Sequence, residues 1–188
     1  QIFKEFVYFS DSDLDGKDFD FIGAIDFAMG KEKGDYSVIA TLARNKSTGI
    51  CYLVDLFMER VHPDILLKEA VGRTLKYQYE TLAVEAQMAQ EWFADKLSDE
   101  LKKYGYPSLT RLKKIKQRTR KALRIEALLP DIQSGRIRFR QSQRALLEQF
   151  EMYPMHKHDD GPDACSMALE AAKVGNKRKA GNAGSYRY

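Results

Sequence analysis

The sequence predicts an α/β protein built on a mixed sheet, in which an antiparallel meander joins parallel strands and helices flank the sheet. Two observations predict this class. Three strand-like segments near the start are separated by short turns, which is typical of a meander. Amphipathic helical segments then alternate with short apolar strands, which is typical of helix–strand crossover units. The chain of 188 residues is long enough for one domain with its own core.

The first predicted strand is the apolar run 21–27, which carries one acid, Asp26, near its end. A continuous apolar run of this length is typical of a strand that is covered on both faces, at the centre of a sheet. β-Branched and partly alternating residues predict two more strands after it. These strands and the turns before them are expected at 28–34 (turn), 35–43 (strand), 45–49 (turn) and 50–57 (strand).

The rest of the chain alternates between helices and strands. Pro63 opens a helix that extends to Tyr79, because proline suits the first helical turn. The strand 81–85 follows, and a right-handed crossover places it parallel to and beside 21–27. The later elements are expected at 89–104 (helix), 107–112 (strand), 118–134 (helix), 136–140 (strand), 141–152 (helix) and 163–173 (helix).

The composition divides the chain into three parts. Residues 1–20 are expected to be a linker or entry segment, and 21–174 the folded domain. Residues 175–188 form a basic tail whose composition and lack of periodicity predict disorder. The start at Gln1 rather than methionine predicts a fragment or a processed product. No apolar stretch approaches the ~18 residues that cross a bilayer, so we expect no membrane partner.

Acids from three parts of the chain are expected to meet at one edge of the sheet. Asp26 and Glu85 end neighbouring parallel strands, at the carboxyl edge where open α/β sheets place their sites. Asp160 and Asp163 lie one helical turn apart where the last helix begins. Oxygen ligands suit Mg²⁺ or Mn²⁺, and two such ions hydrolyse a phosphodiester. We therefore predict a two-metal site in which Asp26 bridges, Glu85 and Asp163 flank it, and Asp160 adds a further ligand.

Plainer interpretations of these residues stay open. An acid that ends a strand is commonly a solvated loop residue, and Asp160 and Asp163 are also suited to capping the last helix. His158 is suited to a hydrogen-bonded loop position or to a role as proton shuttle. A zinc site of His156, His158 and Cys165 would lack a second half with recognisable spacing.

The net charge of +4 is unevenly distributed, because residues 111–124 hold eight basic side chains and no acid. Such a run favours a polyanionic partner, and lysine and arginine there would neutralise phosphates without reading sequence. The alternating segment 136–140 adds a second basic face. A solvated helix face is the alternative. The predicted DNA contacts are Lys113, Lys114, Lys116, Arg118, Arg120 and Lys121.

Four motifs together identify a family. They are the strand 22–26, the segment 34–37, the strand end at Glu85, and the helix start 158–164 with the letters HDDGPDA. With them the chain, from about residue 20 to 174, resembles the nuclease domain of a tailed-bacteriophage terminase large subunit. The resemblance implies an RNase H-like fold and cleavage of double-stranded concatemeric viral DNA during genome packaging, with two divalent ions, Mg²⁺ or Mn²⁺.

Matched residue by residue, the resemblance implies that Asp26, Glu85 and Asp163 form the catalytic acidic triad. Asp160 falls on an accessory metal position, and Asp35 and His158 are possible accessory residues. The implied partners are double-stranded DNA, an N-terminal packaging ATPase domain, and possible contacts with the portal and the small terminase subunit. The implied location is the host cell cytoplasm, without secretion.

Two other functions remain as alternatives. One is another RNase H-like nuclease, such as a junction resolvase or a transposase core, although a transposase triad more typically ends on glutamate where this chain has Asp163. The other is a catalytically inactive module that binds DNA or docks on a portal ring.

Overall fold

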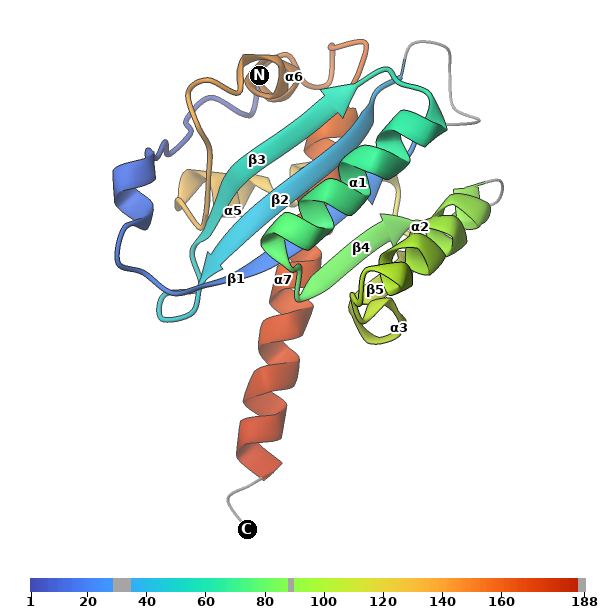
Figure 1. The fold of residues 1–188 in the computed structure, drawn as a ribbon. Coiled ribbons are helices and arrows are strands. Elements are labelled where there is room, and N and C mark those ends of the chain that lie inside the picture. The colour runs from blue at the N-terminus through green and yellow to red at the C-terminus, as the bar shows by residue number, and fades with distance from the viewer. Residues whose placement is uncertain (29–34, 88–89, 186–188) are drawn as a thin grey trace.

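The computed structural model describes residues 1–28, 35–87 and 90–185, and for 176–185 only the course of the helix. Within these residues, six strands form one mixed sheet in the order β5-β4-β1-β2-β3-β6 (Figure 1). The pairs β1–β2 and β2–β3 are antiparallel, and the other three pairs are parallel. The strands are β1 Phe19–Asp26, β2 Ser37–Asn45, β3 Cys51–Glu59, β4 Thr81–Glu85, β5 Leu112–Ile115 and β6 Ile137–Arg138. The predicted mixed sheet is confirmed.

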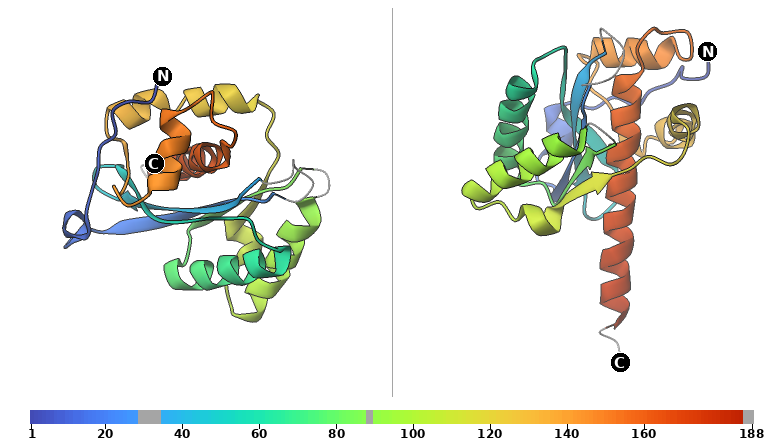
Figure 2. Two further views of the ribbon diagram at one scale, coloured as in Figure 1. Left: turned by 90° about the horizontal axis from the view of Figure 1, so that it is seen from above. Right: turned by 90° about the vertical axis from the view of Figure 1, so that its right-hand side faces the viewer.

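Helices cover both faces of the sheet, as the view from above shows (Figure 2). One layer holds α1 Pro63–Tyr77, α2 Glu91–Lys103 and α3 Ser108–Arg111. The other holds α4 Lys121–Glu126, α5 Leu129–Gln133, α6 Arg144–Glu151 and α7 Asp160–Ser185. The far half of α7 extends beyond the sheet (Figure 2). No described helix is both long enough and apolar enough to cross a membrane.

The central strand β1 contributes to both apolar layers because alternate side chains of a strand point to opposite faces. Ile22 and Ala24 belong to the core under α5–α7. Ile25, and Phe27 directly after the strand, belong to the core under α1 and α2. These four side chains are at most 1% exposed, and each large one contributes about 1.5–3 kcal/mol by burial. The end of β1 is thereby held rigidly between the layers.

Two predicted elements of the third quarter are wrong. The strand expected at 107–112 is a single helical turn, α3, and the strand lies later, at β5 within the basic run. Leu112 pairs with Leu82, so the open edge of β4 supplies the hydrogen-bond partners that four residues of β5 need. The helix expected at 118–134 is split into α4 and α5, because Pro130 lacks an amide hydrogen and suits a first helical turn.

Both termini differ from their predicted descriptions. The entry segment is packed on the domain through Phe3, which is fully buried with its ring 5.1 Å from that of Phe150. Helix α7 continues to Ser185, where we predicted disorder from residue 175. Extending an existing helix costs much less free energy than nucleating a new one, and the first half of α7 is already packed on the sheet. This explains why so polar a segment is helical. The predicted turn at 28–34 lies almost wholly outside the described residues.

Candidate metal centre

Asp26 and Glu85 lie side by side because β1 and β4 are neighbouring parallel strands. Ile25 stands opposite Val84 in the register, and the next residue of each strand is the acid. Asp26 is fully buried, and Glu85 is 7% exposed. The predicted pairing of these two strand ends is therefore present.

Helix α7 brings two further acids over the same edge of the sheet. Asp163 is 4% exposed and Asp160 is 1% exposed, both in the first turn. This turn packs closely on α6, since a Cβ added at Gly161 would lie 2.6 Å from Leu146 Cδ1. The Gly161 amide also donates to Gln149 Oε1 at 2.9 Å. The glycine thus permits the close approach that sets the position of both acids.

Asp26, Glu85 and Asp163 each place one carboxylate oxygen within 4.8 Å of the others. Three buried carboxylates at this spacing form an oxygen-only donor set, which suits hard divalent cations such as Mg²⁺ and Mn²⁺. Buried like charges are costly unless cations accompany them, so the arrangement fits a metal. The structure brings together the three residues that the sequence singled out as a triad.

Asp160 belongs to a second group of potential ligands with Asp35 and His158, whose ligand atoms are also within 4.8 Å of one another. His158 Nδ1 lies 3.2 Å from Asp35 Oδ1, and Arg60 Nη2 lies 3.4 Å from His158 Nε2. Arginine can only donate, so Nε2 accepts and Nδ1–H faces Asp35. The Tyr36 amide donates to Asp160 Oδ2 at 3.1 Å. The predicted accessory residues Asp35 and His158 are thus beside Asp160.

The environment disfavours negative charge on both acids of α7. Burial is the main cause that raises the pKa of Asp163 above its ordinary value, and Asp26 raises it further, while Arg124 opposes them. Burial likewise raises the pKa of Asp160, with Lys121 opposing it and Asp26 adding to it. A bound cation would reverse this balance by stabilising the carboxylates.

Sequence reasoning did not foresee that basic side chains turn inward to these acids. Arg124 Nη2 lies 3.0 Å from Oδ1 and 3.2 Å from Oδ2 of Asp163. Lys121 Nζ lies 2.6 Å from Asp159 Oδ1 and 3.3 Å from Asp160 Oδ1. The sequence feature that could have indicated this contact is the spacing of Lys121 and Arg124. They are three residues apart, which places both side chains on one face of α4. Lys121 was expected to contact DNA, and here it is ion-paired within the chain.

The basic run is less free than its sequence indicated. Lys114 on β5 is paired with Asp95 and Glu91 of α2. The remaining predicted contacts are Lys113, which is half-buried, and the exposed Lys116, Arg118 and Arg120. The second basic segment, at β6, lies at the opposite edge of the sheet. The two basic strand segments that together favoured DNA binding are therefore separated by the width of the sheet.

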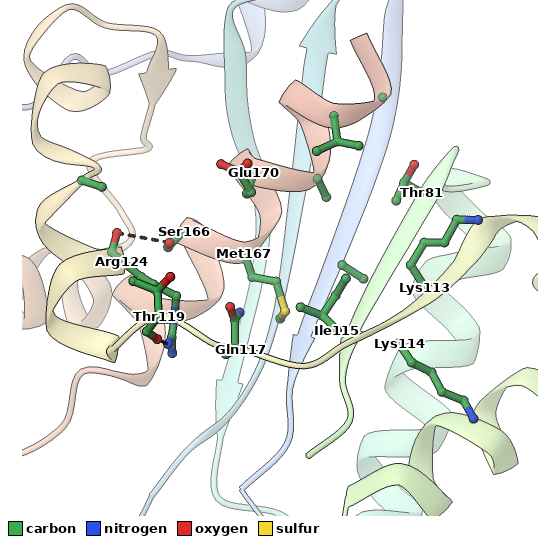
Figure 3. Close-up of a pocket in the computed structure, with 15 residues that line it drawn as sticks. Thr81, Lys113, Lys114, Ile115, Gln117, Thr119, Arg124, Ser166, Met167 and Glu170 are labelled. Atoms are coloured by element: carbon green, nitrogen blue, oxygen red, sulfur yellow. Dashed lines mark hydrogen bonds between the residues drawn. The ribbon is translucent and has the colours of Figure 1, made fainter. Parts of the chain in front are cut away.

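A cavity of about 690 Å³ lies between α7 and the edge of the sheet (Figure 3). Met167 and Ala171 of α7 line one wall, and Ile115 lines the other. Three side chains of the basic run also line it, those of Lys113, Lys114 and Arg124. Arg124 therefore contacts Asp163 and borders this cavity at the same time.

The sequence from residue 23 to 172 matches a family model described as the terminase RNase H-like domain. No curated protein matches the chain. Among solved structures, the large terminase nuclease from thermophilic phage G20c with bound zinc has a TM-score of 0.61 and 15% identity, over 90% of this chain and 94% of that one.

The manganese-soaked terminase nuclease domain of human cytomegalovirus has a TM-score of 0.62 and 15% identity, over 87% of this chain and 89% of that one. A large terminase from another thermophilic bacteriophage, in complex with ADP, has a TM-score of 0.57 and 11% identity, over 80% of this chain and 39% of that one. At these identities the likeness shows the fold. Because the family model spans most of its length, the chain belongs to the terminase RNase H-like domain family.

Proposed function

We propose that this domain is a metal-dependent endonuclease that cleaves double-stranded concatemeric viral DNA during genome packaging, with two Mg²⁺ or Mn²⁺ ions. One observation carries the proposal. Asp26, Glu85 and Asp163 are buried at the ends of neighbouring strands and a facing helix, with oxygens within 4.8 Å of one another, in a terminase-family domain. This is a donor set for hydrolysis of a phosphodiester rather than for a structural zinc.

Each side chain has a distinct part. Asp26 would bridge the two ions, because it comes from the rigid central strand. Glu85 and Asp163 would hold the ions from either side of Asp26, and Asp160 would add an outer ligand from the same helix turn as Asp163. When bound, two divalent ions would activate a water and stabilise the leaving oxygen of the phosphodiester.

His158 and Asp35 support the outer side of the site. Asp35 faces Nδ1 of the imidazole and keeps its tautomer, so Nε2 keeps a lone pair towards Arg60. Both side chains have a potential ligand atom within 4.8 Å of one of Asp160, and His158 is the proposed proton shuttle at this side of the site.

The proposed partners follow from the family and from its solved members. The substrate is double-stranded DNA, met in the host cell cytoplasm. The chain spans about two-fifths of the phage large terminase solved with ADP, so an ATPase domain is the proposed neighbour within a full-length protein. Portal and small terminase subunit are proposed as further partners of that assembly.

The test is cleavage of supercoiled plasmid with Mn²⁺ or Mg²⁺ by the wild type and by Asp26→Asn and Glu85→Gln. Loss of a ligand that stabilises transition-state charge should lower the rate by roughly 100-fold or more. Asp99→Asn, an exposed acid on α2, is the matched control and should cleave as the wild type does. Cleavage that survives Asp26→Asn would contradict the site. DNA binding without cleavage in either metal would favour the inactive binding module.

A further inference from the structure

Two basic side chains of α4 hold the acids of the proposed metal centre. Arg124 reaches both oxygens of Asp163, and Lys121 reaches Asp159 and Asp160. The Arg124 side chain is 14% exposed and that of Lys121 is 35% exposed, so both charges are largely enclosed with their partners. In this arrangement neither cation is directed to an external anion.

A divalent ion and Arg124 compete for the same carboxylate. An ion bound to Asp163 would lie about 2.0–2.6 Å from one of its oxygens. The guanidinium nitrogen is 3.0 Å from Oδ1 and 3.2 Å from Oδ2, so the two cations would be near neighbours. Like charges at that separation in a buried site repel strongly. Lys121 would likewise be a near neighbour of an ion bound to Asp160, because its Nζ lies 3.3 Å from Asp160 Oδ1.

The fold offers the Arg124 side chain a second position. Its backbone is fixed to α7, because Ser166 Oγ donates to the Arg124 carbonyl oxygen at 3.2 Å (Figure 3). The cavity of about 690 Å³ lies next to it, and Lys113 lines the same cavity. Rotation of the side chain into this cavity would free the guanidinium from Asp163 and from the Thr119 carbonyl oxygen, to which it also donates, and would bring it into the space that Lys113 lines.

We propose that Lys121 and Arg124 form a cation-exchange switch: they neutralise the acids when ions are absent, and bound ions release them to contact the phosphates of DNA. The proposal rests on the proposed function, since it takes the carboxylates as metal ligands and DNA as the partner. Metal binding then creates part of the DNA-binding surface. By linkage, DNA must favour metal binding to the same extent.

The test uses the double variant Lys121→Gln/Arg124→Gln in two binding experiments. Mn²⁺ is titrated calorimetrically without DNA. Binding of a fluorescently labelled duplex is then measured by anisotropy in EDTA and in Ca²⁺ over a series of salt concentrations, with the duplex checked for integrity on a gel afterwards. Neither readout depends on the activity of the metal-loaded enzyme.

For the wild type, the slope of log DNA affinity against log salt concentration should be steeper in Ca²⁺ than in EDTA by up to about 1.8. This corresponds to ~0.9 for each of the two new phosphate contacts. The double variant should bind Mn²⁺ roughly tenfold more tightly, because the competing cations are gone. Its salt dependence should be the same in both conditions. If the basic pair only positioned the carboxylates, the variant would bind Mn²⁺ more weakly, and the switch would be wrong.

Two controls complete the test. Lys116→Gln, in the same basic run, should weaken DNA binding equally in EDTA and Ca²⁺ and leave the difference in salt dependence intact. The exchange Lys121→Arg/Arg124→Lys keeps both charges and should restore wild-type behaviour, which excludes misfolding as the cause. A double variant that keeps the wild-type difference would overturn the switch while plasmid cleavage still supports the nuclease. Absence of plasmid cleavage by the wild type would instead contradict the proposed function.

Discussion

At the scale of single residues, Asp163 is subject to two opposing influences. Burial and the nearby Asp26 raise its pKa, and Arg124 lowers it, with burial prevailing. Asp160 has the same balance with Lys121 as its cation. The ordinary pKa of each carboxyl is 3.8, and folding raises it. At a pH just above 3.8 such a group is therefore more often protonated in the folded protein than in the unfolded chain. Its contribution to stability is therefore present at low pH and declines as pH rises through the raised value.

This balance leads to a pH dependence of metal binding. Protons compete with ions for Asp160 and Asp163, whose pKa values are raised above the ordinary 3.8, so Mn²⁺ affinity should rise over a pH series that starts at 3.8, and binding should release protons. Calorimetry in buffers of different ionisation enthalpy measures both quantities. An affinity that stays constant over this range would show that these acids do not bind the ion.

A second residue-scale prediction concerns which lysines contact DNA. Lys114 is compensated by Asp95 and Glu91, whereas Lys116 is exposed and without an ion-pair partner in the described part of the chain. Lys116→Ala should therefore reduce the salt dependence of DNA binding by about 0.9, and Lys114→Ala by much less. Anisotropy titrations over a salt series distinguish them. Equal effects would mean that the Lys114 ion pairs break on binding.

At the scale of elements, three independent pieces of structure determine the carboxylate geometry. The register of β1 against β4 aligns two acids, and the first turn of α7 adds the third. That turn is positioned by α6, through the contact at Gly161 and its hydrogen bond to Gln149. The carboxylate cluster therefore depends on how two helices pack as much as on the sheet that carries Asp26.

Substitution of Gly161 tests this dependence. The added methyl of Gly161→Ala would overlap Leu146 Cδ1 at 2.6 Å and Gln149 Oε1 at 2.8 Å, so overpacking should lower the free energy of unfolding in EDTA by about 1–3 kcal/mol. The shifted turn should also weaken Mn²⁺ binding. Urea unfolding and calorimetry measure the two effects.

Gly72→Ala on α1 is the matched control, because nothing lies within 4 Å of the added methyl. An alanine in an exposed helix interior should stabilise by up to about 1 kcal/mol and leave Mn²⁺ binding unchanged. If Gly161→Ala behaved like Gly72→Ala, the α6–α7 contact would have no part in positioning the acids.

At the scale of the whole molecule, α7 has two parts with different surroundings. Its first half is packed on the sheet as far as Ala172, whose carbonyl oxygen accepts from Arg44. Beyond this point it leaves the body of the domain (Figure 1). The division into a domain at 21–174 with additions at each end remains a prediction, because Phe3 in the first part also belongs to the core.

A chain that ends after Gly175 should therefore keep its stability. Removal of 176–188 takes away about ten helical residues, 176–185, and should lower the far-UV circular dichroism accordingly. The free energy of unfolding in urea should stay within about 0.5 kcal/mol of that of the full chain. Unchanged helix content would support the disordered tail that the composition predicted. A lower free energy of unfolding would mean that the extension packs on the domain.

The sequence by itself determined the strands that carry Asp26 and Glu85, the acid-bearing helix start and the family, because apolar runs and local motifs depend on neighbouring residues alone. It did not determine the place of β5, the split into α4 and α5, or the partners of Lys121 and Arg124. These features depend on contacts between segments that are distant in the sequence. Leu112 pairs with the open edge of β4, and the acids of α7 face a basic run that contains no acid. Only the tertiary structure decided that part of the predicted DNA-binding charge is directed at the acids of the candidate metal centre.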